Sequence, residues 1–141
     1  MTAFAKEAGL KPQGAMDLRT YDPEDGEYWD FNRPEIMKKA VKKVHEEEPD
    51  LLFVCPLCAP FSSLQQWNYP RMQVEAVKNK LDQGLHHLYF SVLLCLVQYQ
   101  AGRYFALEQP SRATSLRTEV TQQITSLPGV QAVTFEFACW A

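Results

Sequence analysis

The sequence predicts an α/β fold, a Rossmann-like arrangement in which a mainly parallel sheet is flanked by helices. Two apolar runs, 51–54 and 103–107, each lead into polar residues and a proline, a pattern typical of buried strands that end in loops. Between them, residues 70–101 carry apolar side chains at three- and four-residue spacing, which predicts a long covering helix. Strands that alternate with helices imply right-handed crossovers and parallel pairing.

The remaining elements follow from the same periodicities and from residues that start or stop helices. We expect Asn32 to cap a helix that Pro49 stops, Gly84 to bend the long helix, and Gly102 to end it. In chain order the expected elements are a helix at 1–10, strands at 14–18 and 28–31, a helix at 33–48, the strand 51–54, the helix 70–101, the strand 103–107, a helix at 116–127 and a strand at 130–137.

The helix expected at 33–48 has a basic face. Its members are Lys38, Lys39, Lys42 and Lys43. A phosphate group is one conceivable ligand of this face. Three glutamates at 46–48 follow directly, however, and cancel most of the positive electrostatic potential of the lysines. A solvated helix face is therefore the better interpretation.

The composition of the chain limits the classes of protein to which it can belong. The chain has 141 residues, 46% of them hydrophobic, which suits one domain with a real core. A formal charge of -3 argues against bulk electrostatic binding to nucleic acid, so any basic contact must be local. No signal peptide and no apolar run near the ~20 residues of a bilayer span are present. The sequence thus predicts a soluble, intracellular chain that does not bind membrane, with its four cysteines as thiols.

The strand 51–54 runs into Cys55, Pro56 and Cys58, a stretch with three interpretations. Both cysteines can be small apolar residues of a core and its rim. A C-x-x-C pair after a strand also suits a dithiol or half of a zinc site. In the third interpretation Cys58 alone is a nucleophile, since Pro56 and Pro60 stiffen the backbone on either side of it at a strand end, where open α/β sheets place ligands.

Zinc is the weakest of these interpretations. A structural site needs four ligands, and the chain has no second paired spacing. The other candidates are Cys95, Cys139, His45, His86 and His87, and the adjacent pair 86–87 points to different helix faces. We therefore expect no metal site.

Two segments carry a family resemblance. The segment 56–62, Pro-Leu-Cys-Ala-Pro-Phe-Ser, resembles the Pro-Pro-Cys-x-x-Phe-Ser loop of the DNA cytosine-5 methyltransferases, and 107–110, Leu-Glu-Gln-Pro, resembles the Glu-Asn-Val segment of that family. Both fall at strand ends in the family's order, and the resemblance spans about 14–137. It implies S-adenosylmethionine as cofactor and cytosine-containing DNA as partner.

The resemblance also implies roles for individual residues. Cys58 would add to carbon 6 of a flipped cytosine, and Glu108 would hold the ring nitrogen that is protonated as carbon 5 becomes nucleophilic. Asp17 would bind the ribose hydroxyls of the cofactor, Asp30 would lie beside its adenine, and Pro56 would complete the cofactor site. Such chemistry needs a Cys and a Glu that converge on one base, because an unactivated ring carbon is a poor nucleophile.

The chain also departs from the family pattern. Leu57 replaces the second proline, Gln109 replaces asparagine, and Pro110 stands in place of valine. The family's first strand with its Phe-x-Gly-x-Gly loop, its target-recognition region and its Gln-x-Arg-x-Arg strand have no counterpart in 1–141. We therefore expect one partial class I methyltransferase-like catalytic domain over 1–141, with its first strand missing, no target-recognition domain and weak or absent cofactor binding.

Other functions stay open at this point. The chain can be an inert methyltransferase remnant or an assembly subunit, with a second chain that completes the sheet beside 51–54. It can also be a C-x-x-C dithiol oxidoreductase, in which Cys55 is an exposed thiol of lowered pKa. The methyltransferase interpretation instead buries Cys55 and exposes Cys58.

Overall fold

The computed structural model describes residues 6–7 and 9–135 of the chain. They belong to two compact units, Met1–Asp50 and Leu51–Ala141, and each unit is described by itself. The helix expected at 1–10 falls largely outside the described residues.

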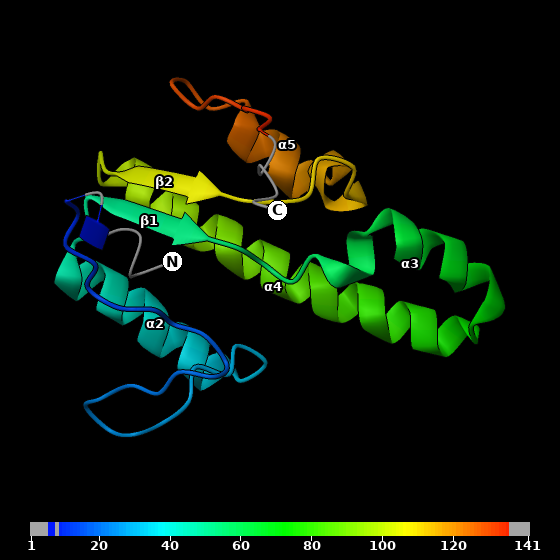
Figure 1. Ribbon diagram of the computed structural model, residues 1–141, viewed down its shortest axis with the longest axis horizontal. Coiled ribbons are helices and arrows are strands. Elements are labelled where there is room, and N and C mark those ends of the chain that lie inside the picture. Colours follow the sequence, from blue (N-terminus) through cyan, green and yellow to red (C-terminus); the bar gives the residue numbers. More distant parts are fainter. Residues whose placement is uncertain (1–5, 8, 136–141) are drawn as a thin grey trace. The chain divides into compact units, whose positions relative to one another are not determined.

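Helix α2, Pro34–Glu47, is the main element of the first unit (Figure 1). Pro34 stands at its first position, where the missing N–H would have had no intrahelical partner. Glu48 ends the helix in the left-handed region, with a φ of 45°. The buried residues of α2 recur every fourth position and are Ile36, Ala40 and Val44. The sequence had placed the cap one residue early, at Asn32, whereas Arg33 holds that position.

A network of charges fastens the loop before α2 to that helix. Asp22 is only 1% exposed. The Nζ atom of Lys39 lies 2.8 Å from Oδ2 of Asp22 and 2.6 Å from Oδ2 of Asp25. Lys39 also lies over the ring of Trp29, 4.8 Å from its centroid, a favourable cation–π arrangement. Lys43 lies 4.0 Å from Oδ1 of Asp22.

The basic face of α2 therefore differs from the expectation. Lys38 and Lys42 are exposed as the sequence predicted, but Lys39 and Lys43 are half-buried and are engaged by acids of their own unit. The acids that meet Lys39 come from the loop before the helix, a contact that helical periodicity along 33–48 does not reveal.

The second unit contains a two-stranded parallel sheet. Strand β1, Leu51–Val54, pairs with strand β2, Tyr104–Leu107, in a register that sets Leu51 opposite Tyr104 and Val54 opposite Leu107. The expected parallel pairing of these two segments is confirmed. Along β1, Val54 is buried while Leu51 and Phe53 are exposed, so this strand has only one covered face, whereas its unbroken apolar run predicted a strand buried on both faces.

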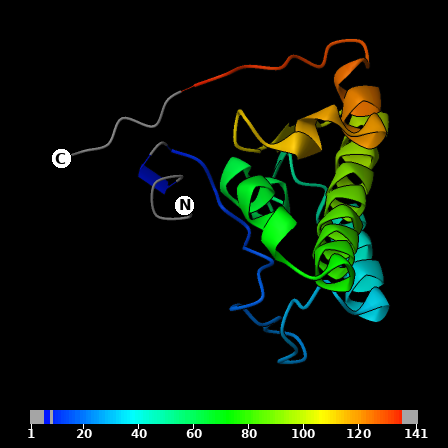
Figure 2. The ribbon, with the colours of Figure 1, turned by 90° about the vertical axis from the view of Figure 1, so that its right-hand side faces the viewer.

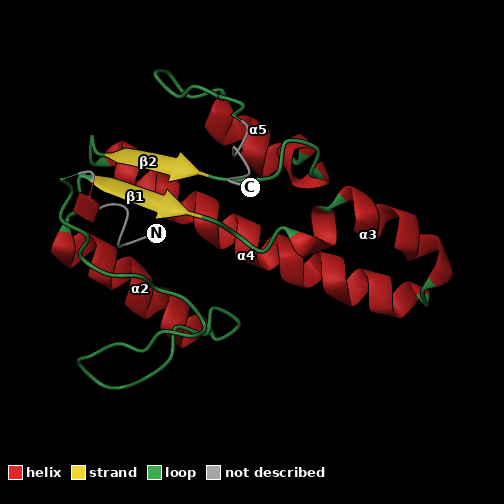
Figure 3. Cartoon of the chain, viewed as in Figure 1, coloured by secondary structure: helices red, strands yellow, loops and turns green. Residues whose placement is uncertain are grey.

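Helix α4, Val74–Gln100, connects the two strands and packs against both of them (Figures 1 and 3). It begins four residues later than expected, because a short helix α3, Ser63–Asn68, and a 3₁₀ turn, Tyr69–Arg71, come first. Ser62 caps α3, since its Oγ accepts the N–H of Gln65 at 3.2 Å. The chain turns back after α3, so that α3 and the start of α4 run in opposite directions (Figure 2).

The C-terminal end of α4 holds the start of β2 in place. Gln98 is fully buried, and its Nε2 donates to the carbonyl of Tyr104 at 3.0 Å while its Oε1 accepts from Nε of Arg103 at 2.8 Å. Gly102, with a φ of 69°, makes the turn that follows the helix, as expected. Helix α5, Glu119–Thr125, then packs on α4.

Three of the expected strands are not formed over the residues that the structure describes. Residues 14–18 make a local turn instead, in which the N–H of Asp17 donates to Oγ1 of Thr20 at 2.9 Å, and such contacts compete with strand pairing. Over 28–31 only Tyr28 pairs, in an isolated antiparallel bridge to Tyr21. Residues 130–135 alternate in sequence but have no strand beside them in the described part, and 136–137 lie outside it. A strand without a neighbour has no place for its backbone bonds.

None of the helices in the described residues has the combination of length and apolar character that would let it cross a bilayer.

Candidate active site

The loops that follow β1 and β2 meet at one edge of the sheet. Because the strands are parallel, their carboxyl ends lie side by side. The N–H of Glu108 donates to the carbonyl of Val54 at 2.9 Å, which extends the ladder one residue past β2. The residues that the sequence singled out after the two strands are thereby brought to the same place.

Cys55 is the thiol that contacts Glu108. The residue as a whole is exposed, yet its sulfur is partly desolvated. This desolvation, the charge of Glu108 and a hydrogen bond to its carboxylate raise the pKa of Cys55 to about 11, with a smaller effect from Cys58. A neutral thiol that donates to a carboxylate is favoured by such surroundings. Cys55 is therefore protonated at neutral pH.

Cys58 lies three residues further along and is half-buried. It caps a 3₁₀ turn, Ala59–Phe61, and its carbonyl accepts the N–H of Phe61 at 3.0 Å. The methyltransferase interpretation expected an exposed Cys58 and a buried Cys55, whereas Cys55 is the more exposed residue. The expected roles of Cys58 and Glu108 as catalytic residues stay predictions, since the described contacts of Glu108 are with Cys55 rather than with Cys58.

The loop is anchored before Cys58 by Pro56. Pro56 is buried, and its carbonyl accepts a hydrogen bond from Nε2 of Gln109 at 3.3 Å. The same Nε2 donates to the carbonyl of Glu108 at 3.0 Å. The Oγ of Ser115, a fully buried residue, donates to Oε1 of Gln109 at 2.5 Å. One side chain thus joins the loop after β1 to the segment after β2.

The loop is anchored after Cys58 by Pro60 and Phe61, both buried. The carbonyl of Pro60 accepts the hydroxyl of Tyr69 at 2.5 Å, and the carbonyl of Phe61 accepts Oγ1 of Thr114 at 3.5 Å. Both residues also pack on α4 at Gly84, where a side chain would not fit. Cys58 therefore stands in a segment that is held at both ends.

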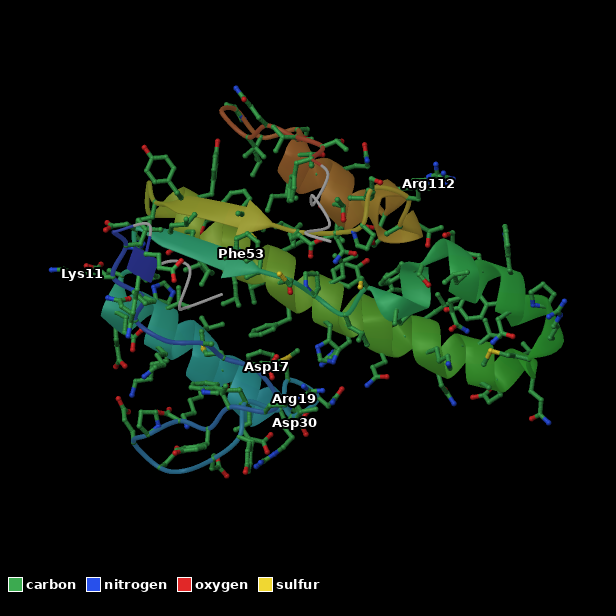
Figure 4. All side chains as sticks on the ribbon, viewed as in Figure 1. Lys11, Asp17, Arg19, Asp30, Phe53 and Arg112 are labelled. Atoms are coloured by element: carbon green, nitrogen blue, oxygen red, sulfur yellow. The ribbon has the colours of Figure 1, made fainter. Side chains whose placement is uncertain are left out.

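The two expected cofactor-binding aspartates belong to the first unit. Asp17 is exposed, and its Oδ1 accepts the N–H of Arg19 at 2.8 Å. Asp30 is half-buried, and its Oδ1 accepts from the N–H of Asn32 at 3.0 Å and from Nδ2 of Asn32 at 2.8 Å. Figure 4 labels Asp17, Arg19 and Asp30 on the loops that precede α2. Pro56, the third expected cofactor residue, belongs to the second unit and is engaged by Gln109.

Asp30 opens on a shallow cavity of about 470 Å³ in the first unit. Its lining includes Leu18, Tyr28 and Arg33. The cavity is wide open to solvent, and the guanidinium of Arg33 on its wall is already paired with Glu27 and Glu35, so a nucleoside would find a surface site here and not an enclosed pocket. Asp17 is not among the residues that line it, so this cavity includes only one of the two aspartates.

Sequence reasoning missed the part that three residues play in holding the Cys58 loop. They are Gln109, Ser115 and Gly84. Gln109 was noted only as a departure from the family's asparagine, although its position next to Glu108 and before a proline was a usable signal. Ser115 carries no such signal in the sequence pattern, although it lies only six residues from Gln109, and Gly84 carries none because its contact with Phe61 joins two different elements.

Metal ligands do not gather in the described residues, where no three His, Cys, Asp or Glu side chains come close enough together to hold an ion. Comparison of the chain with family models, with curated proteins and with solved structures finds no match.

Proposed function

We propose that the chain is a DNA cytosine-5 methyltransferase-like domain in which Cys58 is the nucleophile and Glu108 is the acid. One observation carries the proposal. The parallel pairing of β1 with β2 brings the Cys58 loop and Glu108 to one edge of the sheet, and Gln109 joins the two segments. A thiol and a carboxyl from neighbouring strand ends are what addition to a pyrimidine ring requires.

In this proposal the sulfur of Cys58 bonds to carbon 6 of a cytosine that has left the duplex. As the sulfur–carbon bond forms, the Cys58 thiol gives up its proton to the Glu108 carboxylate, the electron pair of the 5,6 double bond moves to carbon 5, and Glu108 passes the proton on to nitrogen 3 of the ring. Carbon 5 then takes up a methyl group. Loss of the proton from carbon 5 and departure of the Cys58 sulfur restore the ring. Cys55, which stays protonated, donates to Glu108 and so orients its carboxylate.

S-adenosylmethionine would supply the electrophilic methyl group when bound. The residues of the first unit fit its nucleoside part, because Asp17 and Asp30 offer acceptors for hydroxyl and amine groups and Asp30 opens on a shallow cavity. Both aspartates already accept local N–H groups, and Asp17 is exposed to water. Hydrogen bonds in such positions contribute only about 0.5–1.5 kcal/mol each. We therefore expect cofactor binding weaker than the low micromolar range.

The test is covalent capture of DNA. A duplex that carries 5-fluorocytosine forms the Cys58 adduct but cannot lose fluorine from carbon 5, so with S-adenosylmethionine present the protein stays attached to it. We expect Cys58→Ala to abolish the shifted band and Glu108→Gln to reduce its rate of formation at least about a hundredfold. Cys55→Ala, three residues from Cys58, removes only the thiol that orients Glu108 and should retain capture, at a rate higher than that of Glu108→Gln.

The outcomes separate the proposed classes. Capture that depends on Cys58 but not on Cys55 supports the methyltransferase proposal. A folded chain that captures no fluorinated oligonucleotide, with or without S-adenosylmethionine, contradicts it and favours an inert remnant or an assembly subunit.

A dithiol oxidoreductase is the second candidate, and the exposure of Cys55 next to Cys58 favours it. The pKa of about 11 opposes it, because the attacking thiol of such enzymes has a lowered pKa. The dithiol interpretation would be supported if the chain reduced the disulfides of a small protein such as insulin and if Cys55→Ala and Cys58→Ala lost this activity equally.

A further inference from the structure

The side-chain amide of Gln109 makes three hydrogen bonds, one of which joins the segment after β2 to the loop after β1. Its Nε2 donates to the carbonyls of Pro56 and Glu108, at 3.3 and 3.0 Å, and its Oε1 accepts the hydroxyl of Ser115 at 2.5 Å. An amide NH₂ has two protons, so both donors are used. We infer that Gln109 is a positioning residue that fixes the backbone of the Cys58 loop, an inference that rests on the proposed role of Cys58.

The orientation of this amide is determined by its neighbours. If the amide were turned over, Oε1 would face two carbonyl oxygens, which have no proton to donate. The hydroxyl of Ser115 can serve either orientation, so the two carbonyls of Pro56 and Glu108 decide. Ser115 is fully buried and holds the oxygen end. The amide is therefore locked at both ends.

The contact with Pro56 has a direct effect on the backbone that leads to Cys58. The proline ring fixes φ of Pro56, and a hydrogen bond to its carbonyl restricts ψ. With both dihedrals held, the peptide plane between Pro56 and Leu57 has one orientation. Cys58 is the residue directly after Leu57. A small rotation at this plane would shift the Cys58 sulfur, and misplacement by about 1 Å can cost about a hundredfold in rate.

The contact with Glu108 fixes the position of that residue relative to the same amide. The carbonyl of Glu108 accepts from the same Nε2 that binds Pro56. The N–H of Glu108 donates to Val54. The backbone N–H of Glu108 is thus held by the end of β1, and its carbonyl is held by the amide that also binds the loop after β1. Glu108 and Cys58 are therefore kept at a set separation without a described contact between these two side chains.

The experiment compares two nearly isosteric substitutions in the full chain, Gln109→Met and Gln109→Glu. Methionine removes all three hydrogen bonds, and a glutamate carboxylate would face the two carbonyls. The first readout is alkylation of Cys58 by iodoacetamide, followed by peptide mass spectrometry. The second is the rate constant and the apparent affinity for capture of a fluorocytosine duplex. Gln123→Met, an exposed glutamine on α5, is the matched control.

We expect the two readouts to move in opposite directions. Alkylation of the half-buried Cys58 should rise about fivefold in both variants, since the loop loses a restraint of about 1 kcal/mol. The rate constant for capture should fall at least about tenfold, with affinity for the duplex within about twofold. Ser115→Ala leaves the donors in place and should show the same directions with a smaller size. Gln123→Met should match the parent chain.

A purely structural role would give a different pattern, in which melting temperature falls while the reactivity of Cys58 in the folded chain is unchanged. Unchanged alkylation in Gln109→Met and in Ser115→Ala overturns the inference. If both Gln109 variants fail to fold, Ser115→Ala decides by the same two directions. If the parent chain captures no duplex, the proposed function fails, and the alkylation readout alone still decides whether Gln109 holds the Cys58 loop.

Discussion

Gly84 on α4 lies directly against the ring of Phe61. A Cβ atom at Gly84 would be 2.9 Å from Cε2 of Phe61 and 3.0 Å from Cγ of Pro60, closer than carbon atoms approach in a relaxed structure. Gly84 is buried in the middle of α4, and the helix continues through it. The glycine that was expected to bend this helix allows the helix to approach the loop that carries Cys58.

Gly84→Ala should therefore destabilise the chain. Alanine at an ordinary helix position stabilises by up to about 1 kcal/mol relative to glycine, but displacing Phe61 and Pro60 costs about 1–3 kcal/mol. We expect a net loss of about 1–2 kcal/mol in the free energy of unfolding by urea. Lys80→Ala, an exposed position on the same helix, is the control and should change stability by less than about 0.5 kcal/mol. A Gly84→Ala chain more stable than its parent would show that Phe61 and Pro60 can move aside without a loss of folding free energy.

Cys55 should react slowly at neutral pH because its pKa is raised to about 11. In a Cys58→Ala background, the rate of alkylation of Cys55 by iodoacetamide should keep rising with pH beyond 9, since only the thiolate reacts. Glu108→Gln removes a negative charge beside the sulfur, so the rate at pH 8 should increase. Glu119→Gln, an exposed carboxyl of the same unit, should leave it unchanged. A rate that levels off below pH 8 would mean that Cys55 is an activated thiol.

The first unit should lose stability in acid because of Asp22. Its contact with Lys39, the N–H of Glu24 and the charge of Lys43 lower the pKa of Asp22 below its ordinary value of 3.8. The folded state thus binds this proton less readily than the unfolded state. The stabilisation is present above pH 3.8 and is lost as pH falls through the lowered pKa.

The buried Trp29 can report this transition. With Trp67 and Trp140 replaced by phenylalanine, its emission should shift to the red as pH falls from 4 toward about 2. Asp22→Asn should be less stable at pH 7 and should show a flatter pH dependence over that interval. Asp50→Asn, an exposed carboxyl of the same unit, should follow the parent curve. Parallel curves for Asp22→Asn and the parent would rule out Asp22 as the group that titrates.

The outer edge of β1 should recruit a second chain, as the sequence analysis anticipated. The carbonyl of Val54 points to β2, so by alternation the N–H and C=O of Phe53 point to the opposite edge, where no described strand pairs with it. Phe53, which Figure 4 labels beside β1, is also 44% exposed. Such an edge favours association.

We expect sedimentation to show an oligomer for the parent chain. Phe53→Pro, which removes the outward N–H but keeps the bonds to β2, should shift it to the monomer. Phe53→Val, which keeps the N–H, should remain associated. A monomeric parent chain, or a Phe53→Pro chain that associates like its parent, would exclude pairing at this edge.

The sequence by itself determined the local elements and the parallel pair. Apolar periodicity located α2 and most of α4, the two unbroken runs located β1 and β2, and the helix between them required parallel pairing. It also placed Cys58 and Glu108 after those strands. These features depend on neighbours a few residues apart, or on the length of one connection, so they can be derived from the order of residues alone.

Only the tertiary structure decided which groups touch. It set Cys55 rather than Cys58 against Glu108, seated Gln109 between Pro56 and Ser115, and brought Gly84 against Phe61. It also left 14–18 in a turn, where the Asp17 and Thr20 groups satisfy each other. The contacts of Cys55 with Glu108 and of Gln109 with Pro56 join residues 53 positions apart, and the outcome compares each contact with local alternatives at differences of about 1 kcal/mol. Sequence patterns describe the local side of that comparison, and packing supplies the other.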